Sequence, residues 1–137
     1  METQTNLIYR EACRRSHQIL ATYLTLWAWK KRVDCVAVHR DQLHPYLGIA
    51  ARRQQRLRWL VSDVRHLFPY TKELYQERGN KGTVYLSRRR FPDGVFEKTM
   101  YDLDRVELLV QHGLPAAMIE KLPAEKGMAR SLTSVVI

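Results

Sequence analysis

The chain has 137 residues, of which 45% are hydrophobic and 27% charged. These proportions are typical of one folded domain and exclude a largely disordered chain. The formal net charge of +9 indicates a polyanionic partner.

The positive charge is confined to the first two thirds of the chain. Residues 1–91 hold 18 basic and 7 acidic residues, whereas residues 92–137 hold 5 basic and 7 acidic ones. Arginine outnumbers lysine by 16 to 7, and the planar guanidinium suits phosphates and guanine edges. The charge pattern therefore favours nucleic acid over an anionic membrane as the partner.

No targeting or membrane-spanning segment is indicated. The first ten residues lack the basic region and apolar core of a signal peptide. The longest apolar stretch, 19–28, is interrupted by threonines and is too short to span a bilayer. Cys13 and Cys35 form no pattern and are expected to be free thiols in a reducing compartment. We therefore expect a cytoplasmic protein.

The first element is a long helix. Apolar residues recur with helical spacing from Ile19 to Ala28 and predict a helix over about Asn6–Lys31. Trp27 and Trp29 lie on different faces of it, so one is expected in the core and the other at a dimer contact. The apolar run Val33–Val38 that follows predicts a short strand or an extended connector.

Two helices are predicted to meet at a glycine in the middle of the chain. Asp41 is suited to cap the first helix, whose apolar face is formed by Leu43, Tyr46 and Leu47. Gly48 ends that helix, and a second helix is predicted over about Ala50–Leu67. Leucine and valine residues line the inner face of the second helix: Leu57, Leu60, Val61 and Val64. Its opposite face is expected to display Arg52, Arg53, Gln54, Gln55, Arg56 and Arg58.

The pattern changes to strands after Pro69. Residues 71–76 and 83–87 predict a β-hairpin around the turn Glu-Arg-Gly-Asn-Lys-Gly, and 95–101 a third strand. Helical segments are predicted at 103–111 and 115–121. These last two helices meet at Gly113 and are flanked by acidic residues, so they are expected to serve packing or dimerisation.

The segment Asp41–His66 resembles the helix-turn-helix superfamily, and the hairpin after it resembles the wing of the winged-helix branch. The matching residues are Leu43, Leu47, Gly48, Ile49 and Leu57, while His44 and Gln54 depart from the pattern. The resemblance implies an α+β, mainly helical fold, namely a winged helix-turn-helix with a long N-terminal helix, a β-hairpin wing and C-terminal helices. It also implies a DNA-binding domain over 1–101 and a C-terminal packing or dimerisation element over 102–137.

The function implied is sequence-specific binding of double-stranded DNA by a small transcriptional regulator that acts as a homodimer. So compact a chain would suit a viral or plasmid protein. Arginine and glutamine at the start of a recognition helix can make bidentate contacts to guanine and adenine, and a basic hairpin can hold phosphates. The expected DNA-binding residues are Arg52, Arg53, Gln55, Arg56, Arg58, Arg78, Lys81, Arg88, Arg89 and Arg90.

No enzymatic activity, cofactor, metal or small-molecule effector is expected. Cys35, His39 and His44 lack the paired partners that a structural zinc site requires, and the few acids of 1–91 are too scattered for a nuclease metal site. Two alternatives stay open. One is an RNA-binding module that grips folded RNA with the hairpin and Arg88–Arg90. The other is an interaction or inhibitor protein that docks on an acidic surface without any nucleic-acid role.

Overall fold

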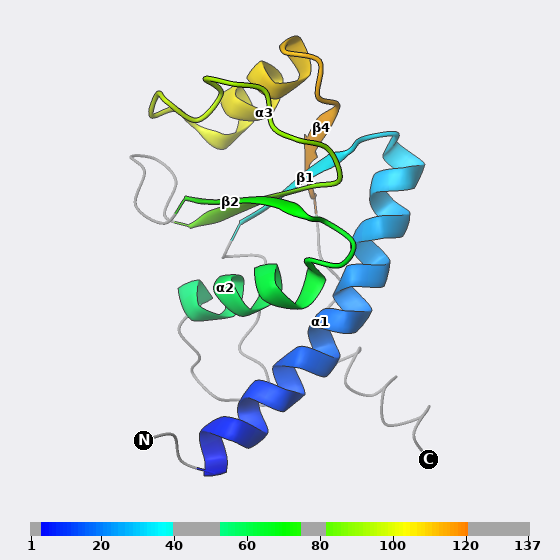
Figure 1. Ribbon diagram of the computed structural model, residues 1–137, viewed down its shortest axis with the longest axis vertical. Coiled ribbons are helices and arrows are strands. Elements are labelled where there is room, and N and C mark those ends of the chain that lie inside the picture. The colour runs from blue at the N-terminus through cyan, green and yellow to red at the C-terminus, as the bar shows by residue number, and fades with distance from the viewer. Residues whose placement is uncertain (1–3, 40–52, 75–81, 121–137) are drawn as a thin grey trace.

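The computed structural model describes residues 4–39, 53–74 and 82–120. In these residues it is an α+β fold with three helices and one open, mixed sheet of four strands. The sheet lies between two layers of helix, with α1 and α2 on one face and α3 on the other (Figure 1). The α+β class expected from the sequence is confirmed.

Helix α1 spans Gln4–Lys31, close to the predicted bounds, and ends in two lysines. Its inner face is fully buried and packs against α2 and the sheet through Leu20, Ala21, Leu24 and Ala28. Trp27 is half-buried against this core, whereas Trp29 is 74% exposed. The expectation that the two tryptophans occupy different faces is confirmed.

Strand β1, Cys35–His39, confirms the strand reading of the apolar run after the first helix. It pairs with β3 in antiparallel fashion and with β4 in parallel fashion, so it lies inside the sheet. Alternate side chains enter opposite cores. Val36 and Val38 face α1 and α2, while Cys35 and Ala37 face the α3 side. Both faces of β1 are therefore buried.

Helix α2 spans Arg53–Val64, and the hairpin strands β2 and β3 span Tyr70–Leu74 and Thr83–Ser87. The two strands pair antiparallel, which confirms the predicted hairpin. The strand order is β2-β3-β1-β4, so β3 is an interior strand and all five of its residues are buried. The hairpin is thus one half of the sheet and does not stand apart from it.

Helix α3 spans Asp102–Gln111, as predicted, and Gly113 follows it with a left-handed φ of 90°. The helix predicted at 115–121 is wrong, because Ala116–Met118 form strand β4 on the edge of β1. Alanine and methionine favour helix locally, but here pairing with the open edge of β1 satisfies their backbone groups and decides the conformation. Of the two predicted C-terminal helices, only α3 is present in the described residues.

The strand predicted at 95–101 is also absent, and turns occupy this segment. Two backbone carbonyls of this segment accept hydrogen bonds from a side chain instead of from a neighbouring strand. The fully buried guanidinium of Arg105 donates hydrogen bonds to the carbonyls of Val95 at 2.6 Å and Lys98 at 2.7 Å. Phe96 packs edge-on against Tyr85 of the sheet at 5.3 Å between ring centroids. The apolar residues of this segment therefore cover the sheet without joining it.

None of the helices in the described part of the chain is long and apolar enough to cross a membrane. The predicted first helix of the helix-turn-helix, with Asp41, Leu43, Leu47 and Gly48, lies outside the described residues, as does the tail from residue 121.

Candidate nucleic-acid interface

Helix α2 has two contrasting sides. Leu60, Val61 and Val64 are buried in the core shared with α1 and the sheet. On the solvent side, the exposed residues among the described side chains, which begin at residue 58, are Arg58, Ser62, Arg65 and His66. Because residues four and three apart share a helix face, Arg58, Ser62 and Arg65 form one polar, basic side.

The acidic residue of α2, Asp63, is turned toward α1. Arg10 donates two hydrogen bonds to its carboxylate, at 3.1 and 2.8 Å, and Nδ1 of the buried His17 lies 2.7 Å from Oδ2. The Arg10 guanidinium also lies over the Trp59 ring, 4.9 Å from its centroid. These contacts hold α2 against α1 and compensate the negative charge of the Asp63 carboxylate.

The pKa of Asp63 is lowered from its ordinary value of 3.8. Burial by itself raises this pKa, but the hydrogen bonds and positive charges of His17 and Arg10 together outweigh the effect of burial. Asp63 is therefore held as a carboxylate, and the outward side of α2 is left with basic and neutral side chains.

The predicted wing residues come before and after β3 in the chain. Arg78 and Lys81 precede β3 and lie outside the described residues. Arg88, Arg89 and Arg90 follow β3, about 20 Å from Gly82 at some 3.3 Å per strand residue. The arginine triplet therefore lies at the end of β3 opposite to Gly82.

The triplet is held beside the start of β1 instead. Arg88 donates a hydrogen bond to the Val33 carbonyl at 2.9 Å and pairs with Asp34 at 3.4 Å. Arg89 pairs with the other oxygen of Asp34 at 3.3 Å and stays largely exposed, as does Arg90. Asp34 thus offsets part of the positive charge of Arg88 and Arg89.

The remaining predicted contacts are only partly described. Arg53, Gln55 and Arg56 belong to α2, but their side chains are not among those described. Arg52 lies wholly outside the described residues. Of the predicted recognition-helix residues, Arg58 is the one whose side chain is described, and it is exposed. The sequence analysis did not include Arg65 on the same side as Arg58, although the two are seven residues apart, which is about two helical turns.

In the described ranges, no group of three or more His, Cys, Asp and Glu side chains is placed to hold a metal ion. No family model matches the chain, and no curated protein or solved structure matches it either.

Proposed function

We propose that this chain is a sequence-specific double-stranded DNA-binding protein, a small transcriptional regulator that uses α2 as its recognition helix. The observation that carries the proposal is the division of charge on α2. The charge of its acid, Asp63, is compensated by Arg10 and His17 of α1, while Arg58 of α2 and Arg65 of the turn after it face solvent. A helix with this outer side can approach the negative potential of a DNA groove without repulsion.

The order of elements supports a winged helix. The resemblance implies a long N-terminal helix before the recognition helix and a β-hairpin after it. Here α1, β1, α2, β2 and β3 follow in that order, and β1 pairs with β3. The first helix of the helix-turn-helix is proposed for the segment after His39, which is not described. Helix α3 and strand β4 extend this arrangement.

The proposed contacts divide into two groups. Base contacts are assigned to Arg52, which lies outside the described residues, and to the first half of α2, where arginine and glutamine suit guanine and adenine edges: Arg53, Gln55, Arg56 and Arg58. Phosphate contacts are assigned to the hairpin tip, with Arg78 and Lys81, and to the exposed Arg89 and Arg90 at the far end of β3. Arg88 is assigned a positioning role, because it is held by Val33 and Asp34.

We further propose a homodimer formed through α1. Leu26 and Trp29 are one helical turn apart, and 60% and 74% of their surfaces are exposed. Aromatic residues are enriched at protein interfaces, and a second copy that covers this pair would remove it from water. Two copies would present two recognition helices to a two-fold symmetric site.

The proposal is tested by selecting duplexes from a random-sequence pool and measuring binding by fluorescence anisotropy at one salt concentration. We expect the selected duplex to bind about a thousandfold more tightly than an unrelated one. Equal binding of all duplexes would restrict the protein to phosphate contacts. Tighter binding of a structured RNA would favour the RNA-binding alternative, and no binding of either would favour a protein-interaction role.

A further inference from the structure

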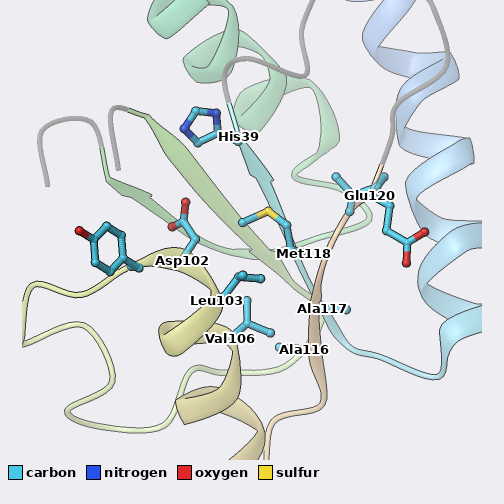
Figure 2. A pocket seen from close by; sticks show the side chains of 10 residues that line it. His39, Asp102, Leu103, Val106, Ala116, Ala117, Met118 and Glu120 are labelled. Carbon is cyan, nitrogen blue, oxygen red and sulfur yellow. The ribbon is translucent and has the colours of Figure 1, made fainter. Parts of the chain in front are cut away.

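A surface cavity of about 830 Å³, largely open to solvent, lies between α3 and the β1–β4 edge of the sheet, on the side away from α1 and α2 (Figure 2). Its volume is in the range of small-molecule sites in proteins. The walls are apolar and come from α3 on one side, with Leu103 and Val106, and from β4 on the other, with Ala116, Ala117 and Met118.

The cavity has one deeply buried charged group. Asp102, the first residue of α3, is only 7% exposed, and its carboxylate lies at the cavity wall between Met118 and the start of α3 (Figure 2). The Thr83 hydroxyl donates a hydrogen bond to Oδ2 at 2.7 Å, and the Tyr85 hydroxyl donates one to Oδ1 at 2.8 Å. Both carboxylate oxygens are therefore fixed in place by the sheet.

These two hydroxyls leave Asp102 able to accept more hydrogen bonds. A carboxylate has about four acceptor positions, of which Thr83 and Tyr85 use one on each oxygen. Burial, followed by the hydrogen bond to Asp102, raises the pKa of Tyr85, so its hydroxyl stays a donor. The neighbouring Arg105 guanidinium donates hydrogen bonds to the carbonyls of Val95 and Lys98 and lies over the Phe96 ring.

The other charged side chain at the cavity, Glu120, is oriented differently. Its carboxylate is directed toward α1 in Figure 2 and lies 4.0 Å from Lys31 Nζ, and its side chain is 80% exposed. His39, at the end of β1, and the largely exposed Tyr101, just before α3, supply the other polar groups of the rim. The polar group that a bound molecule would meet inside the apolar walls is thus the carboxylate of Asp102.

We infer that this cavity binds a small organic amine, with its apolar body between α3 and β4 and its ammonium group on Asp102. The walls favour an apolar body through burial, and a buried acceptor-only carboxylate favours a positively charged donor over a neutral or negative group. The site stands independently of DNA binding, and its test requires no DNA.

The test uses three probes of one shape: phenethylamine, phenethyl alcohol and phenylacetate, which are cationic, neutral and anionic. Binding is followed by amide NMR shifts of the full chain and by calorimetry. We expect phenethylamine to shift resonances of α3 and β4 and to bind about tenfold or more tightly than phenylacetate, as for a charge-assisted hydrogen bond. Absence of shifts with phenethylamine, or equal binding of phenylacetate, would overturn the inference.

Two matched pairs of variants locate the site. Val106→Phe puts a larger side chain into the wall of the cavity beside Met118 and Leu103, whereas Val110→Phe adds the same volume to a half-exposed position of the same helix outside it. Asp102→Asn removes the buried charge, whereas Asp104→Asn removes an exposed one. We expect Val106→Phe and Asp102→Asn to abolish phenethylamine binding and the two controls to keep it. Thermal unfolding shows which variants are folded, and binding retained by a folded Val106→Phe protein would place the amine elsewhere.

Discussion

His17 Nδ1 lies 2.7 Å from Asp63 Oδ2 and joins α1 to α2 across 46 positions of the chain. Arg10 completes the contact with two hydrogen bonds to the same carboxylate. The three side chains hold the proposed recognition helix on the long N-terminal helix. The orientation of α2 therefore depends on a polar contact as well as on its apolar face.

Replacing Asp63 with alanine should destabilise the protein, because Arg10 and the buried His17 would lose their shared acceptor. We expect a loss of about 2–4 kcal/mol in the free energy of unfolding, measured by urea denaturation. Glu11 provides a matched control, since it pairs with Arg14 and Arg15 on the exposed side of α1. Glu11→Ala should cost less than about 1 kcal/mol. Equal losses for the two variants would contradict the role of Asp63.

The same contact predicts how stability depends on pH. The folded-state pKa of Asp63 lies below its unfolded value, so its contribution is present above the unfolded pKa of 3.8 and is lost as the pH falls through the folded pKa. The difference in unfolding free energy between the wild type and Asp63→Asn should therefore shrink as the pH falls below 3.8, because the carboxylate becomes protonated. Denaturation curves measured along a pH series test this. A difference that grows as the pH falls below 3.8 would be inconsistent with a lowered pKa of Asp63.

Cys35 should be unreactive in the folded protein. Burial, and then the negative charge of Asp34, raise the pKa of its thiol to about 12, so the nucleophilic thiolate is scarce at neutral pH. In a Cys13→Ser background, a thiol reagent should label Cys35 only as fast as the protein opens, and rapidly in denaturant. Fast labelling of the native protein would show that the β1 core is accessible.

Trp29→Glu should dissociate the proposed homodimer, because it places a charge at the centre of the exposed pair formed with Leu26. Sedimentation should then give the mass of a single chain where the wild type gives two. Val110→Glu, at an exposed apolar position on α3 across the sheet from α1, is the control and should stay dimeric. A wild type that sediments as a monomer would remove the α1 dimer from the proposal.

The parts of the fold that sequence predicted were those with strong local signals. Helical spacing in α1, the turn-flanked apolar runs of β2 and β3, and the pattern at 103–111 all gave the right elements. Strand β4 was predicted as helix because Ala116–Met118 has no strand signal of its own and adopts its conformation by pairing with β1. That pairing depends on residues about 80 positions away, which local patterns do not report.

The candidate site was predictable only in part. The basic character of α2 follows from its composition, and Arg58 is exposed as expected. The inward role of Asp63 could have been suspected, because it is a single acid in a basic helix, but its partners lie on a distant element. Asp102 has the sequence signature of an ordinary acid in a first helical turn. Its hydroxyl partners, Thr83 and Tyr85, become neighbours only when α3 covers the sheet.

Substitution of Arg58 tests most directly whether α2 contacts the DNA bases. Arg58→Ala and the control Lys98→Ala each remove one exposed positive charge, the latter from the segment that covers the α3 side of the sheet. Each variant is titrated by anisotropy against the selected duplex and an unrelated duplex, after urea denaturation has shown it to be folded. We predict that Arg58→Ala loses about 1–3 kcal/mol on the selected duplex and much less on the unrelated one, and that Lys98→Ala changes neither. An equal loss on both duplexes, or no loss for Arg58→Ala, would contradict base reading by α2.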